Sequence, residues 1–153
     1  MTEINDLRSA IAHLKTLPQH FHETDVEIDP NADLAGVYKR NGGGGTVGRP
    51  TGIGPAMMFN NVKGYPGSRV LVGMHASRER VAALLGAPTR ELGIYLGKAI
   101  KKTIEPKLTD NPNPPCQEVV HRADDPNFDL RKILPAPTNT PEDAGPYFCM
   151  GLV

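Results

Sequence analysis

The residues of this chain that could bind a metal are its histidines, two of which lie close together. His20 and His22 form an H-x-H pair near the start of an expected strand, where alternate side chains point to the same side. Zinc sites in proteins use at least three protein ligands. A third ligand, such as His75 or His121, would have to come from elsewhere in the fold. We therefore predict no metal site in this chain.

Nucleophilic and acid–base chemistry also has candidates, but no complete set. Cys116 and His121 fit neither the spacing of a zinc knuckle nor a recognisable nucleophile–base pair, and a cysteine in a half-buried strand is usually a small apolar residue. Carboxylates pair at residues 124–125 and 142–143, within Asp-Asp-Pro-Asn and Thr-Pro-Glu-Asp. Both patterns are typical of turns and caps. Spacing alone therefore predicts no catalytic residue here.

The glycine-rich stretch matches a phosphate-binding motif only in its letters. Residues 43–48 satisfy G-x-G-x-x-G, but the motif needs a strand before it and a helix N-terminus after it. Here a helix is expected before it and Arg49-Pro50 follows, which favours a flexible turn. Arg49 and Arg69 flank the central strands, and pairing with a carboxylate is the default for each. These patterns predict no cofactor-binding residue.

Composition limits the class of protein. A chain of 153 residues suffices for one domain with a real core and is short for two. The formal net charge is zero, which removes the simplest argument for nucleic acid or an anionic membrane as partner. The sequence has two cysteines, no signal peptide and no apolar run near the ~20 residues of a membrane span. We expect a cytoplasmic protein with free thiols.

The expected elements are organised around residues 55–77. Two apolar runs, 56–59 and 70–74, lie on either side of a turn-rich segment in which Gly64 and Gly67 supply turn conformations. The other expected elements are helices at 5–17, 30–37, 78–85 and 90–102, strands at 23–28 and 116–121, and a helical turn at 128–134. The expected buried helix positions are Leu7, Ala10, Ile11, Leu14 and Leu17, then Ala32, Ala35 and Val37, then Leu92, Leu96, Ala99 and Ile100. The fold class is α/β, with α+β as the alternative: a small mixed sheet, packing helices and a proline-rich extended C-terminal arm.

The last residues form an apolar segment without a polar tail. An apolar strand needs partners for its faces and its hydrogen-bonding edge. We therefore expect residues 1–146 to form an N-terminal α/β domain. Residues 147–153 are expected to start a strand that another polypeptide or a missing domain completes.

Three long strings resemble the N-terminal region of the UbiD-like carboxy-lyases. They are ETDVEIDPNADLAGVYKR, GPAMMFNNVKGYPGSRVLVGMHASRERVAALLG and PCQEVVHRADDPNFDLRKILPAPTNTPEDAGPYFCMGL. Within the family they are most similar to hydroxyarylic acid decarboxylases acting on protocatechuate, 4-hydroxybenzoate or gallate. The resemblance covers nearly the whole chain.

This resemblance implies a much longer enzyme. An N-terminal α/β domain precedes a split-barrel domain that holds prenylated flavin mononucleotide (prenylated FMN) and a C-terminal domain that drives oligomerisation. A flavin prenyltransferase supplies the cofactor, and a divalent metal (Mn or Mg) with potassium secures its phosphate. The flavin withdraws electron density from the aromatic acid as carbon dioxide leaves, reversibly and without oxidation, and a Glu–Arg–Glu network supplies the proton.

The family's metal ligands and catalytic residues match no position of this chain. The resemblance therefore assigns no catalytic, cofactor-binding or metal residue here, and this chain alone is expected to be inactive and to bind no cofactor. Phe148, Cys149 and Met150 are the candidates for approaching the active-site cleft.

Two functions stay open at this point. The first is a portion of the decarboxylase that packs on the cofactor domain and walls the cleft, in an enzyme expected to be a homo-oligomer. The alternative is a non-catalytic binding or regulatory module that docks on a partner through its apolar C-terminal strand.

Overall fold

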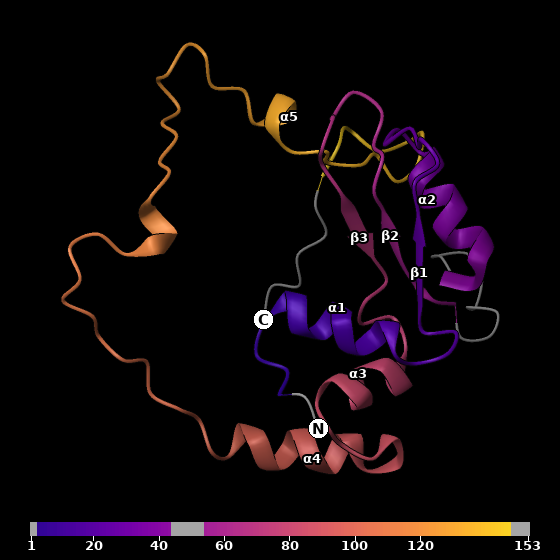
Figure 1. The fold of residues 1–153 in the computed structure, drawn as a ribbon, viewed down its shortest axis with the longest axis vertical. Helices are drawn as coiled ribbons and strands as arrows, with labels where there is room; N and C mark the ends of the chain where they lie inside the picture. Colours follow the sequence, from indigo (N-terminus) through magenta and orange to yellow (C-terminus); the bar gives the residue numbers. More distant parts are fainter. Residues whose placement is uncertain (1–2, 44–53, 148–153) are drawn as a thin grey trace.

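A computed structural model of the chain describes residues 3–43 and 54–147, and Figure 1 shows its course. The elements, in order, are α1 (Leu7–Lys15), β1 (Phe21–Thr24), α2 (Asp33–Tyr38), a π-type turn (Lys39–Gly43), β2 (Ala56–Phe59), β3 (Val70–Val72), α3 (Arg78–Leu84), a 3-10 turn (Thr89–Glu91), α4 (Leu92–Ile100), a second 3-10 turn (Pro115–Gln117) and α5 (Leu130–Ile133). Within the described ranges, no helix is long and apolar enough to cross a membrane.

The sheet has three strands in the order β1-β2-β3, with β2 in the centre. β1 pairs with β2 in parallel, Phe21 opposite Ala56, and β3 pairs with β2 antiparallel, Val70 opposite Phe59. All four residues of β2 are buried, as expected for a strand that reads as one continuous apolar run. The mixed α/β fold and both central strands predicted from the sequence are confirmed.

The core lies between the sheet and α2. Leu34 of α2 packs with a cluster from the sheet and its connecting turn: Met57, Phe59, Val62 and Val70. Gly64 and Gly67 in that turn have φ of 82° and 77°, in the left-handed region where glycine carries no steric penalty. This confirms the turn predicted between the two strands.

The N-terminal caps of α1 and α3 follow ordinary helix chemistry. The carboxylate of Asp6 accepts a hydrogen bond from the backbone N–H of Ser9 at 2.7 Å. Ser77 caps α3, as predicted, and its hydroxyl accepts from the N–H of Arg80. On α1, Ala10 and Leu14 are buried as expected, whereas Leu7, the first residue of the helix, is 57% exposed.

Three predictions for the N-terminal half are wrong in detail. The strand expected at 23–28 is β1 at Phe21–Thr24, because those four residues pair with β2, and Ile28 makes only an isolated bridge to Val62. α2 begins at Asp33 because Ala32 has φ of 68° and interrupts the helix expected from residue 30. Its buried residue is Leu34, whereas Val37 is exposed.

Three predictions for the C-terminal half are also wrong. Thr89 does not cap a helix and instead starts a 3-10 turn. Leu92 is the buried residue of α4, while Leu96 and Ile100, which were expected on the same buried face, are exposed. α4 runs along the bottom of the molecule, beyond α3 (Figure 1), and its main contacts with another element are with the preceding 3-10 turn. The strand expected at 116–121 is a 3-10 turn followed by exposed chain.

Residues 101–128 form an extended segment that leaves the domain after α4 and returns at α5, and we call it the arm (Figure 1). The helical turn expected at 128–134 is confirmed as α5. The chain after α5 lies against the domain, where Pro135 and Pro137 are buried and Thr138 bridges to Asn31.

Candidate functional site

The histidine pair does not assemble a metal site in the described part of the chain. His22 is exposed on β1, and His20 is half-buried with its Nδ1 atom lacking a hydrogen-bond partner. The ring of His121 stacks on Phe128 instead, with centroids 4.9 Å apart. Among residues 3–43 and 54–147, no group of three or more histidine, cysteine or acidic side chains could hold an ion.

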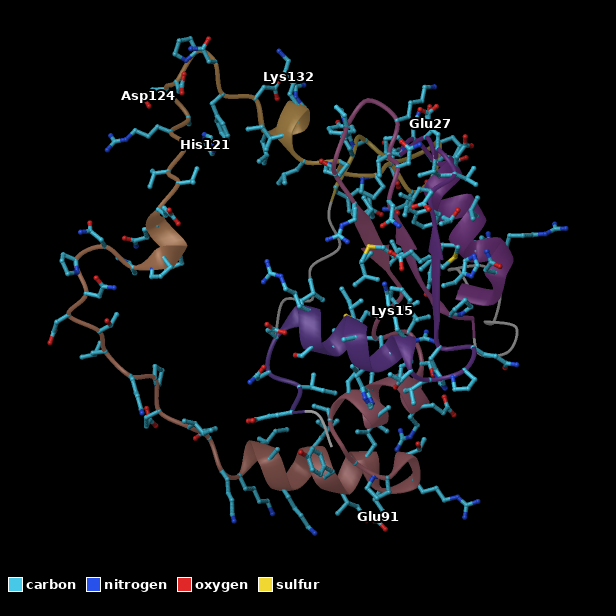
Figure 2. All side chains as sticks on the ribbon, viewed as in Figure 1. Lys15, Glu27, Glu91, His121, Asp124 and Lys132 are labelled. Carbon is cyan, nitrogen blue, oxygen red and sulfur yellow. The ribbon has the colours of Figure 1, made fainter. Side chains whose placement is uncertain are left out.

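The other sequence candidates lie in turns or on the surface. Cys116 is exposed on the arm. Figure 2 shows His121 and Asp124 on the arm, apart from the sheet. Asp125 accepts a hydrogen bond from the N–H of Asn127 at 2.9 Å, which is a turn contact.

Asp143 holds the loop that precedes the chain end. It accepts hydrogen bonds from the N–H groups of Asn139 and Thr140, each at 2.9 Å. The hydrogen bond from the Thr140 backbone is the main cause that lowers the pKa of this carboxyl. The turn interpretation is therefore confirmed for Asp125 and Asp143, and the lowered pKa of Asp143 is the opposite of what a general acid needs.

Several candidates lie outside the described residues: Phe148, Cys149, Met150, Arg49 and most of the glycine-rich stretch 43–48. Arg69, the other arginine singled out from the sequence, is exposed before β3.

The most polar buried feature was not predicted from the sequence, and it centres on Arg80 of α3. Arg80 is 1% exposed. Its Nη1 atom donates to the carbonyl of Gly54 at 2.7 Å, and its Nη2 atom donates to the carbonyl of Gly73 at 3.0 Å. The guanidinium thereby connects the chain just before β2 with the chain just after β3.

Arg80 carries its charge without a carboxylate partner among the described residues. Burial lowers the pKa of its guanidinium. Burial likewise raises the pKa of Tyr38, whose buried hydroxyl has no hydrogen-bond partner among residues 3–43 and 54–147. Because Arg80 is closed off from solvent, we interpret its role as structural. It joins the chain before β2 to the chain after β3 and is not a ligand site. No sequence signal separates it from the exposed Arg78 two positions earlier.

The described residues do not fit a flavin phosphate or its metal ions. Such a site needs oxygen ligands for a divalent metal or several converging cations for the phosphate. Among the described residues, no three histidine, cysteine or acidic side chains come together to hold an ion, and Arg80 is inaccessible. We therefore assign no step of any cofactor reaction to these side chains.

Two protein-family models match the chain. The first, the N-terminal domain of 3-octaprenyl-4-hydroxybenzoate carboxy-lyase (UbiD), covers residues 17–100. The second, the Rift-related domain of the same carboxy-lyase, covers residues 107–153. The second match begins within the arm.

Curated relatives and solved structures agree with these models. Gallate decarboxylase of Lactiplantibacillus plantarum is 51% identical over 97% of this chain and 30% of the relative. The apo structure of 3,4-dihydroxybenzoic acid decarboxylase from Enterobacter cloacae is 64% identical with a TM-score of 0.87, over 97% of this chain and 30% of that one. An evolved dimeric form of the UbiD-class enzyme HmfF from Pelotomaculum thermopropionicum, in complex with prFMN, is 29% identical with a TM-score of 0.72, over 92% and 29% of the two chains. The chain thus spans about 30% of the length of such relatives.

Proposed function

Since this chain belongs to the UbiD family of carboxy-lyases, we propose that it is the N-terminal portion of a reversible, non-oxidative hydroxyarylic acid decarboxylase that uses prenylated FMN. The main support is 64% identity, at a TM-score of 0.87, to an enzyme named for decarboxylation of 3,4-dihydroxybenzoic acid. The 51% identity to a gallate decarboxylase agrees with a phenolic acid as substrate.

The role of this portion is to scaffold the enzyme. In our proposal, residues 1–146 pack on the cofactor domain and wall one side of the cleft, residues 147–153 lead into that domain, and Phe148, Cys149 and Met150 approach the cleft. The catalytic residues and the ligands for the divalent metal and potassium come from the remaining polypeptide. When bound there, prenylated FMN supplies an electrophilic ring that accepts electron density from the aromatic acid.

The partners follow from this assignment. A flavin prenyltransferase supplies the cofactor, and the complete enzyme is a homo-oligomer in the cytoplasm. Neither nucleic acid nor a membrane takes part, in keeping with the zero net charge.

The test is to co-express the complete polypeptide with a flavin prenyltransferase and offer it 3,4-dihydroxybenzoate, gallate and 4-hydroxybenzoate in turn. We expect loss of carbon dioxide from at least one of these acids, and uptake of labelled bicarbonate into the phenol in the reverse direction. A loaded protein that decarboxylates none of the three contradicts the proposal.

A second measurement addresses the scaffold role. Residues 1–153 alone, passed through gel filtration after the same co-expression, should carry no flavin absorbance. Flavin that stays with this fragment would show that these residues hold the cofactor themselves. Stable association of the fragment with an unrelated protein through residues 147–153 would favour the alternative, a binding module.

A further inference from the structure

Asn41 is the one asparagine of the sequence that is followed by a glycine. An asparagine loses its side-chain amide spontaneously when the backbone nitrogen of the next residue attacks the amide carbon, Cγ. A side chain on that next residue obstructs the attack, and glycine has none. Asparagine is accordingly among the thermolabile residues of proteins. The sequence therefore places the most reactive pair for this chemistry at Asn41-Gly42.

The backbone at this pair leaves the helical conformation. α2 ends at Tyr38, and the π-type turn Lys39–Gly43 follows it directly. Within that turn Gly42 has φ of 92° and ψ of 11°, which lies outside the helical region. Asn41 is thus at the end of the helical backbone, and it is exposed. Because helix ends open locally at a small cost in free energy, the nitrogen of Gly42 reaches Cγ of Asn41 without unfolding of the domain.

The contacts that hold the Asn41 amide are weak. Its Nδ2 atom donates to the carbonyl of Val37 at 3.2 Å and to Sδ of Met57 at 3.4 Å. A thioether sulfur is a weak acceptor. Asn60 is the contrast, because its Nδ2 atom donates to two carboxylates, at 3.0 and 2.9 Å. Hydrogen bonds to ionised acceptors are the stronger kind, so the Asn60 amide is held more firmly than the Asn41 amide.

The surroundings of Asn41 suit an amide and do not suit the products of its loss. A carboxylate at this position would face two acceptors, the Val37 carbonyl and the Met57 sulfur, to which the amide now donates. The backbone is also closely packed. A β-carbon on Gly54 would lie 2.6 Å from the carbonyl carbon of Gly42 and 2.8 Å from the carbonyl oxygen of Asn41. Loss of the amide therefore disturbs the contact between the end of α2 and the chain that enters β2.

We propose that Asn41-Gly42 is the site at which this protein undergoes spontaneous deamidation. The backbone nitrogen of Gly42 gives up its proton and bonds to Cγ of Asn41, the Cγ–Nδ2 bond breaks, and the amide nitrogen takes a proton and leaves as ammonia. Water then opens the resulting succinimide ring at one of its two carbonyl carbons. Opening at Cγ gives aspartate. Opening at the main-chain carbonyl carbon gives isoaspartate, which adds a methylene group to the backbone.

The test is to store the complete polypeptide at mildly alkaline pH and follow each asparagine by peptide mapping and mass spectrometry. We expect Asn41 to lose its amide at least about tenfold faster than Asn60, which is held by carboxylates, and than Asn31, which is exposed and precedes an alanine. Isoaspartate at position 41 is detected with an isoaspartyl methyltransferase. Asn41→Gln, which would have to close a larger ring, is the control and should remove that signal. A rate at Asn41 no higher than at Asn31 or Asn60 overturns the proposal.

A second measurement tests the structural consequence with a matched pair of variants of the complete polypeptide. Asn41→Asp and Asn5→Asp each place one carboxylate at an exposed asparagine, and Asn5 lies before α1 with its side chain in none of the hydrogen bonds of the described ranges. We expect Asn41→Asp to lower the melting temperature by about 2 °C and Asn5→Asp by less than about 1 °C. Stored protein should shift in the same direction as Asn41→Asp. Equal shifts for the two variants overturn the disturbance of α2 and β2.

These outcomes do not depend on the proposed function, because every residue involved lies in this chain and the only co-reactant is water. A protein that turns over no aromatic acid but deamidates at Asn41 supports the inference and contradicts the function. An active enzyme in which Asn41 is no faster than Asn31 or Asn60 does the reverse.

Discussion

The phenol of Tyr38 occupies the space that a β-carbon on Gly73 would need. Gly73 directly follows β3, has φ of 72°, and gives its carbonyl to the buried guanidinium of Arg80. Tyr38 is the last residue of α2, so this contact brings the end of one helix onto the end of a strand. The end of α2, the end of β3 and α3 are thus fixed to one another at a single glycine.

Replacing this glycine tests how much the contact contributes. Gly73→Ala should lower the free energy of unfolding by about 3 kcal/mol, because the left-handed conformation costs about 1–2 kcal/mol and the new methyl group displaces the Tyr38 ring at a similar cost. Urea denaturation followed by circular dichroism measures the loss.

Gly67→Ala is the matched control for the backbone cost. Gly67 has φ of 77°, yet a β-carbon there would meet nothing within 4 Å. We expect a loss of about 1 kcal/mol for this variant. If both variants lose the same stability, the packing of Tyr38 on Gly73 contributes nothing.

The hydrogen bonds of Arg80 are tested by a substitution that keeps most of its aliphatic side chain and removes the guanidinium. Arg80→Met leaves the carbonyls of Gly54 and Gly73 without a donor, at about 1–3 kcal/mol each, while it removes the cost of burying the charge. We expect a net loss of about 2 kcal/mol in the free energy of unfolding. Arg78→Met, where the exposed arginine donates to the carbonyl of Thr89 and to no other group in the described ranges, should lose less than about 1 kcal/mol. An Arg80→Met protein as stable as wild type would mean that water or another donor serves the two carbonyls.

The central strands and α3 could be predicted from the sequence because their signals are local. β2 is a run of four apolar residues bounded by turns, and α3 has a serine cap and a glycine stop. Gly86 after α3 has φ of 64°, as a glycine at a helix end often does. Each of these features depends on neighbours within a few residues.

The predictions that were wrong concern features whose structure depends on a distant part of the chain. The apolar stripe of α4 correctly marks a helix, but periodicity cannot tell that Leu92 is the one residue of this helix that the described part of the chain buries. The register of β1 depends on pairing with β2, more than thirty residues later. Arg80 was missed because burial of an arginine requires two carbonyls that the fold brings together from residues 54 and 73.

The two ends of one predicted apolar face give a further prediction. Leu14 is fully buried and Leu7 is 57% exposed, although the helical pattern places both on the same face of α1. Leu14→Ala should lower the free energy of unfolding by about 3 kcal/mol through the cavity it leaves, and Leu7→Ala by less than about 0.5 kcal/mol. Chemical denaturation of both variants measures the difference, and comparable losses would place Leu7 in a contact that the described residues do not make.

The ion pair between Lys63 and Asp29 should make stability depend on pH in the acid range. Lys63 Nζ lies 2.9 Å from Asp29 Oδ2. The hydrogen bond from Lys63 is the main cause that lowers the pKa of Asp29 below its ordinary 3.8, followed by the one from the N–H of Asn31. Because the folded state binds the Asp29 proton less readily than the unfolded state, this contribution is complete above pH 3.8 and is lost as pH falls through the folded pKa.

Lys63→Met removes the main cause of that shift, so its effect on stability should be confined to the same range. We expect the melting temperature of the variant to lie slightly below that of wild type at neutral pH, and the gap to close as pH falls below 3.8. The gap should also shrink at high salt, because both side chains are partly exposed and the pair is screened. Lys39→Met, at an exposed lysine after α2, is the control, and its gap to wild type should not change across this range. A gap for Lys63→Met that stays constant from pH 7 down to well below 3.8 would show that the lysine stabilises the fold by packing and not through the charge of Asp29.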